Sequence, residues 1–89
     1  MENKLLTIIN TYGKSHQVSK LLEEVGELIE TIMNEDKENM VQEIADVMVL
    51  LEQFKNYYGI SSEEITKIFW AKVNRQLDRI EKEKENAKN

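Results

Sequence analysis

The sequence of 89 residues contains no cysteine and no proline, and it contains only three glycines. The lack of cysteine excludes disulfides, thiolate metal sites and cysteine nucleophiles. A composition without proline but rich in Leu, Ile, Glu and Lys predicts an all-α protein. No apolar run approaches the roughly 18 residues of a membrane span, and the N-terminal residues lack the basic start of a secretion signal. We therefore expect a cytoplasmic protein with no membrane partner.

Basic residues are outnumbered, with 12 Lys and Arg against 17 Asp and Glu, which gives a net charge of −5. The imbalance is concentrated in residues 21–46, where nine acids and one base give −8. Proteins that bind nucleic acid need a basic surface, so we expect no nucleic-acid partner. An acidic centre indicates either a solvated helix face or a site for cations.

The apolar pattern predicts four helices within a single domain, 1–89, at roughly 2–12, 16–33, 37–58 and 62–85. Gly13 and Gly59 follow apolar segments and suit the left-handed position after a helix. Asp36 is placed to cap the third helix, and Ser61 with Glu64 has the spacing of a capping box for the fourth. The charged tail after residue 81 is expected to fray.

The third predicted helix is apolar around most of its circumference, from Met40 to Phe54. Such a helix is either buried or covered by a partner chain. A chain of this length buries only about 60% of its unfolded surface, so three other short helices enclose it poorly. We therefore expect a homo-dimer or tetramer that assembles through the central helices.

Two carboxylate pairs stand out on the second and third helices: Glu24 with Glu27, and Glu43 with Asp46. Each pair is spaced by three residues, which places both side chains on one face of its helix. A short connection makes the two helices antiparallel neighbours, so the pairs are expected to meet. Only Lys37 is close in sequence to pair with Glu43 and Asp46. Carboxylates that converge without basic partners repel each other unless a cation binds.

Oxygen ligands without Cys or His favour Mg²⁺, with Mn²⁺ as the other candidate, over Zn²⁺. Di-iron bundles also use facing carboxylates, but they add Glu-x-x-His pairs, and the only histidine, His16, lies outside both motifs. The alternative is that these acids form an ordinary solvated face. Their position on a nearly all-apolar helix weighs against that alternative.

With these two acidic motifs, the chain resembles a known family, the MazG-like all-α nucleoside triphosphate pyrophosphohydrolases. The hallmark of that family is EExxE followed by ExxD on antiparallel helices. Three stretches within residues 10–80 carry the resemblance: YGKSHQVSKLLEEVGELIETI, NMVQEIADVMVLLEQF and AKVNRQLDRI. The resemblance implies a compact four-helix bundle that hydrolyses a nucleoside triphosphate at the α–β bond, giving the monophosphate and pyrophosphate.

The same resemblance implies the roles of the acidic residues. Glu24, Glu27, Glu43 and Asp46 would be magnesium ligands. Glu23 would be catalytic, near a second metal or the attacking water. Four carboxylates carry a charge of −4, which two Mg²⁺ ions can cancel while the substrate's phosphates bridge them.

Residues outside the acidic motifs are implied to bind the substrate. Gln17 and Lys20 match the family pattern ahead of the acids. Lys72, Arg75 and Arg79 form a stripe on the fourth helix, where relatives hold phosphates, although Gln76 stands where asparagine is expected. The alternative for this stripe is a solvated face. Trp70 is expected to line a groove between subunits, near the acidic cluster of the partner chain.

Two other functions stay open from the sequence. Phosphoribosyl-ATP pyrophosphohydrolases share the acidic motif, but YGKSHQ and the last helix fit the MazG-like branch better. A helical module that binds a nucleotide or a protein without turnover is the second alternative. The presence of all four implied metal ligands weighs against it.

Overall fold

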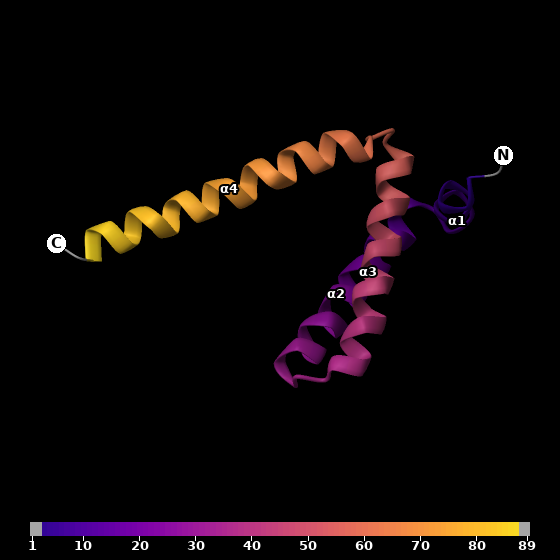
Figure 1. Cartoon of the computed structure of the whole chain (residues 1–89). Helices are drawn as coiled ribbons and strands as arrows, with labels where there is room; N and C mark the ends of the chain where they lie inside the picture. Colours follow the sequence, from indigo (N-terminus) through magenta and orange to yellow (C-terminus); the bar gives the residue numbers. More distant parts are fainter. Residues whose placement is uncertain (1–2, 88–89) are drawn as a thin grey trace. The chain divides into compact units, whose positions relative to one another are not determined.

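The computed structural model describes residues 3–87, which form four α-helices and no strand (Figure 1). The helices are α1 (Lys4–Tyr12), α2 (Lys14–Met33), α3 (Lys37–Tyr57) and α4 (Ser62–Ala87). The all-α prediction is therefore confirmed, and the predicted bounds differ from these by at most two residues. Glu2, which we expected to open the first helix, lies outside the described residues. None of the helices described is both long and apolar enough to span a membrane.

Glycines with positive φ follow two of the helices, α1 and α3. Gly13 adopts φ 92°, and its N–H donates to the Ile9 carbonyl at 2.8 Å, which ends α1. The same residue opens α2, because its own carbonyl accepts from the Gln17 N–H at 3.1 Å. One residue thus makes the whole corner, and α2 begins earlier than the sequence predicted. Gly59 follows α3 with φ 65°, as expected for the position after a helix.

Side-chain caps fix the starts of α3 and α4. The Asp36 carboxylate accepts from the Asn39 N–H at 3.3 Å. The Ser61 hydroxyl accepts from the Glu64 N–H at 3.1 Å, and the Glu64 carboxylate accepts from the Ser61 N–H at 2.8 Å. Both predicted caps are therefore confirmed, and the second is a reciprocal capping box. The backbone bond lowers the pKa of Glu64, because it favours the ionised form.

The chain divides into two compact units, and the boundary in the sequence lies between Gly59 and Ile60. In the first unit, α2 and α3 pack against each other as an antiparallel hairpin, and α1 packs on both (Figure 1). The fully buried Ile9 of α1 and the buried Leu50 of α3 form its apolar centre. The Asn3 side chain also donates to that of Asn56 at 2.9 Å, which joins the start of α1 to the end of α3.

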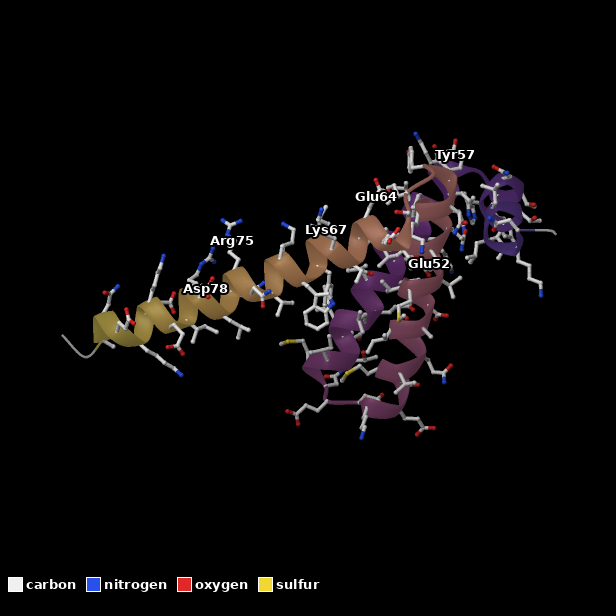
Figure 2. All side chains as sticks on the ribbon, turned by 45° about the horizontal axis from the view of Figure 1, so that its top comes forward. Glu52, Tyr57, Glu64, Lys67, Arg75 and Asp78 are labelled. Carbon is white, nitrogen blue, oxygen red and sulfur yellow. The ribbon has the colours of Figure 1, made fainter. Side chains whose placement is uncertain are left out.

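The second unit is α4, a helix of 26 residues. Its charged side chains, including Lys67, Arg75 and Asp78, project outward along its length (Figure 2). The helix continues to Ala87, beyond the point where the tail becomes highly charged. Fraying of that tail, and a single domain over 1–89, stay predictions.

Many apolar side chains of α2 and α3 are exposed in this structure. Only Ile9 and Leu50 are buried apolar residues among those described. More than half of the surface is exposed for several side chains of the hairpin: Leu22, Ile29, Met33, Val41, Met48 and Leu51. Their spacings, seven and four residues on α2 and seven and three on α3, place them on one exposed apolar stripe of each helix.

The capping box makes a testable contribution to stability. We expect Ser61→Ala to reduce the free energy of unfolding by about 1 kcal/mol, because the Glu64 N–H loses its acceptor. Urea denaturation followed by circular dichroism measures the change. Ser61→Thr, which keeps the hydroxyl, is the matched control. Equal stability of Ser61→Ala and the wild type would contradict the contribution of the cap.

Candidate metal centre

The carboxylates that the sequence singled out come together between α2 and α3. Two sets of three each place one carboxylate oxygen per residue within 4.8 Å of the others. One set is Glu23, Glu24 and Glu27 of α2, and the other joins Glu24 to Glu43 and Asp46 of α3. Glu24 belongs to both sets, so it links the two helices. The predicted meeting of the two pairs is therefore present in the structure.

Glu24 is the most deeply placed of these acids, with 7% of its surface exposed. Glu43 is half-buried, and Asp46 and Glu23 lie at the exposed edge. One oxygen each of Glu24 and Glu43, Oε2 in both cases, is buried without a hydrogen-bond partner in the described part of the chain. Burying an unpaired carboxylate is costly, and a proton or a cation bound to these oxygens would remove that cost.

Without a cation, a shared proton resolves the conflict between these two acids. The hydrogen bond between the carboxyl groups lowers the pKa of Glu24 and raises the pKa of Glu43 to about 7. Burial and the negative charges of Glu27, Glu24 and Asp46 raise the pKa of Glu43 further. These opposite shifts are those expected of two acids that share one proton, which then resides mainly on Glu43.

A basic partner is also present, which corrects one expectation. The Lys20 ammonium lies 3.4 Å from Glu24 Oε1 and 3.8 Å from Glu23 Oε2, one helical turn before them on α2. The expectation that the converging carboxylates lack basic partners was therefore wrong for Glu24. The charge of Glu23 is the main cause that raises the pKa of Lys20. Yet one half-exposed lysine cannot neutralise five carboxylates, and it leaves Glu24 Oε2 unpaired.

A groove of about 400 Å³ runs beside the acids along the α2–α3 hairpin. It is lined by Gln17, Lys20, Glu24, Asp46, Val49, Leu50 and Gln53. The Gln17 amide nitrogen donates to the Gln53 oxygen at 2.8 Å, and both residues are buried. The sequence analysis missed Gln53. Its spacing of seven residues from Asp46, two helical turns on the same face, is the signal that would have found it.

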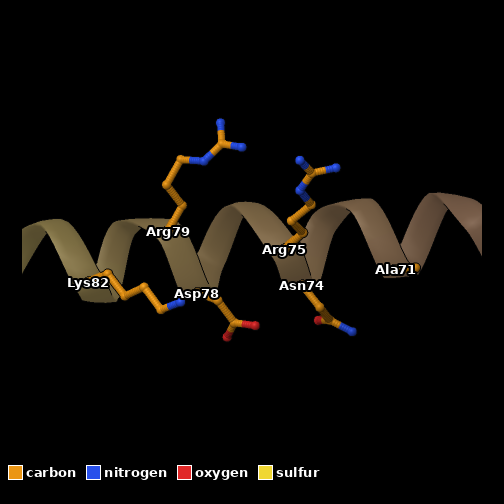
Figure 3. A pocket seen from close by; sticks show the side chains of 6 residues that line it. All are labelled: Ala71, Asn74, Arg75, Asp78, Arg79 and Lys82. Atoms are coloured by element: carbon orange, nitrogen blue, oxygen red, sulfur yellow. The ribbon is translucent and has the colours of Figure 1, made fainter.

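The residues of α4 that were expected to bind the substrate lie in the second unit. Lys72, Arg75, Gln76 and Arg79 line one shallow groove on that helix, as their spacing predicted. Arg75 and Arg79 rise from the same side, while Asn74 and Asp78 point to the other (Figure 3). Trp70 is exposed and packs edge-to-face on Phe69, with ring centroids 5.2 Å apart.

The fold and the site together are those of an all-α protein with facing carboxylates on two antiparallel helices. The family model of the MazG nucleotide pyrophosphohydrolase domain matches residues 13–83. The chain therefore belongs to the MazG nucleotide pyrophosphohydrolase domain family, which confirms the resemblance seen in the sequence. Comparisons with curated proteins and with solved structures gave no match.

The shared proton makes a prediction for the metal-free protein. Because the pKa of Glu43 is raised on folding, its contribution to stability is present at low pH and is lost as the pH rises through about 7. The wild type should therefore lose stability relative to Glu43→Gln between about pH 4.5 and 7. Melting temperatures in chelator, measured across this range, test the difference.

The matched control is Glu30→Gln, which removes one charge from an exposed position of α2. Its melting temperature should follow that of the wild type across the same range. Parallel curves for the wild type and Glu43→Gln would show that Glu43 does not hold the proton.

Proposed function

We propose that the protein is a Mg²⁺-dependent nucleoside triphosphate pyrophosphohydrolase that cleaves the α–β bond of its substrate. The observation that carries the proposal is that Glu24 and Glu43 each bury one oxygen without a partner in the described chain, within a carboxylate cluster whose ligand atoms lie within 4.8 Å of one another. Membership of the MazG family supports the reaction class. A divalent cation fits this space, because it satisfies both oxygens without protonating either acid.

The donor set favours a hard cation. Each ligand candidate offers a carboxylate oxygen, and neither set of three contains histidine or cysteine. Mg²⁺ and Mn²⁺ prefer such oxygens. Glu24, Glu27, Glu43 and Asp46 would hold the metal, and the link through Glu24 allows two ions to share one ligand. When bound, the metal would neutralise phosphate charge and make the attacking water more acidic.

Glu23 has the properties of a general base at the edge of this centre. Its side chain is 58% exposed, so water reaches it, and its only close cation is Lys20 at 3.8 Å in the described structure. Its carboxylate oxygen also lies within 4.8 Å of those of Glu24 and Glu27. From that position it would accept the proton of the water that attacks the α-phosphorus.

Contacts to the rest of the substrate are proposed for two groups of residues. Lys20 lines the groove beside Glu24 and would exchange its loose ion pairs for a phosphate oxygen. Gln17 lines the same groove and contributes a polar contact there. On α4, we assign phosphate binding to Lys72, Arg75 and Arg79, which share one side, and base stacking to Trp70.

The function is tested by pyrophosphate release from a panel of nucleoside triphosphates, with and without Mg²⁺. We expect the wild type to release pyrophosphate only with metal. Asp46→Asn should lose at least about 100-fold in rate, because a metal ligand contributes several kcal/mol of transition-state stabilisation. Isothermal titration should show weaker Mg²⁺ or Mn²⁺ binding by the same variant.

Glu30→Gln is again the charge-matched control and should retain both activity and metal affinity. If Asp46→Asn binds metal like the wild type, Asp46 is not a ligand. If the wild type releases no pyrophosphate from any nucleotide while it binds them, the chain is a binding module rather than a hydrolase.

Assembly into a dimer or tetramer through α2 and α3 is part of the proposal. The exposed apolar side chains of both helices support it, because each Å² of apolar surface left in water forgoes roughly 25 cal/mol. In a two-fold dimer the same apolar surface of each chain would cover that of the other. It would also bring the basic residues of α4 from one chain to the acids of another.

Analytical ultracentrifugation at micromolar concentration should therefore show no folded monomer. Mixing inactive Asp46→Asn chains with inactive Arg79→Ala chains should restore part of the activity, because one mixed site keeps both wild-type residues. A folded, active monomer would contradict the assembly. Failure to recover activity after confirmed subunit exchange would place both residues in the site of one chain.

A further inference from the structure

A pair of buried amides lies in the groove next to the acidic centre. Gln17 and Gln53 are 4% and 2% exposed, and the Gln17 amide nitrogen donates to the Gln53 oxygen at 2.8 Å. Gln17 precedes Glu24 by seven residues, and Gln53 follows Asp46 by seven. Seven residues are two helical turns, or about 10 Å. The groove thus has two polar layers, with carboxylates in one and neutral amides in the other.

A chain of hydrogen bonds determines which atom of Gln53 is free. His16 Nδ1 lies 2.7 Å from Gln17 Oε1, and the His16 ring stacks on Tyr12 with centroids 5.2 Å apart. With its proton on Nδ1, His16 donates to Gln17, and Gln17 in turn donates to Gln53 Oε1. The amide hydrogens of Gln53 then have no partner among the residues described. The Gln53 nitrogen is not among the described side-chain atoms that are buried without a partner, so it reaches solvent, and a ligand in the groove can accept from it.

The surroundings of this donor suit a flat, neutral group better than a phosphate. Val49 and Leu50 supply apolar wall beside the two amides. The one cation in the groove lining, Lys20, is already within 4 Å of two acids. A triphosphate tail would need further positive charge in this layer. A purine or pyrimidine ring needs apolar contact and one or two directed hydrogen bonds.

We propose that Gln53 determines base specificity by donating an amide N–H to an acceptor atom on the edge of the nucleobase. The inference rests on the proposed function, since the phosphates are taken to lie at the acidic layer. Gln17 is a positioning residue, because it holds the Gln53 oxygen and thereby points the nitrogen at the ligand. Uracil and guanine present a keto oxygen where cytosine and adenine present an amino group. With the Gln53 N–H facing this position, keto bases are favoured, because the amino group of cytosine or adenine offers no acceptor there.

UTP and CTP test this directly, because their bases differ at this one edge. The wild type should show a higher kcat/KM for UTP than for CTP, by about tenfold, the value of one good hydrogen bond. Gln53→Met should bring the ratio close to one, mainly by lowering kcat/KM for UTP. The dissociation constants of the α,β-methylene analogues of UTP and CTP, measured by titration calorimetry, should change in the same way.

Two further variants separate specificity from stability. Gln53→Met leaves the buried Gln17 donor without its acceptor, so the variant can lose stability. The double variant Gln17→Met, Gln53→Met removes both partners and should recover stability while the UTP to CTP ratio stays near one. Gln42→Met alters an exposed glutamine of α3 outside the groove lining and should keep the wild-type ratio.

The outcomes distinguish this inference from the proposed function. Equal losses for UTP and CTP in the Gln53 variants, or a wild-type preference for CTP, would overturn the role of Gln53 while leaving pyrophosphate release intact. Absence of pyrophosphate release from every nucleotide would overturn the function instead. In that case, a preference for the UTP analogue that depends on Gln53 would still support the base contact.

Discussion

The opposition of Glu24 and Glu43 across the α2–α3 hairpin is the constraint on which the site depends. The packing of α2 against α3 brings two carboxylates together and buries one oxygen of each. Their oxygens cannot both be ionised there without a compensating charge. A shared proton relieves the repulsion between the two acids, with the pKa of Glu43 raised and the pKa of Glu24 lowered. A divalent cation would relieve the same repulsion without a proton. The same geometry thus forms a cluster of carboxylates that could bind a metal ion.

The other features of the hairpin support this opposition. Gly13 turns the chain within one residue, which starts α2 early enough for Gln17 and Lys20 to stand on the same face as Glu24. The turn at 34–36 and the Asp36 cap fix where α3 begins, and therefore which acids of α3 meet α2. Since both helices have the same rise per residue, the amide pair also meets, two turns away. One register between α2 and α3 therefore sets the acidic layer and the amide layer together.

The two groups of charged residues expected at the site lie in different units of the chain. The acids of the candidate metal centre lie in the first unit, and the arginines and lysine expected to bind phosphate lie on α4, the second unit. The first unit buries few apolar side chains of its own. The assembly between chains that we propose would supply both the opposite charge for the acids and apolar cover for the hairpin.

The sequence by itself determined the four helices, their caps and the acidic pairs, because these depend on contacts three or four residues apart. Its family signature also determined the membership that the match over residues 13–83 confirmed. Tertiary structure decided what local spacing does not encode. It paired Gln17 with Gln53 across 36 positions, selected Glu24 as the acid common to both sets, and left one oxygen of Glu43 buried without a partner. Lys20 lies between these cases, because its spacing to Glu23 and Glu24 was visible in the sequence, whereas its closeness to both depends on the side-chain conformations.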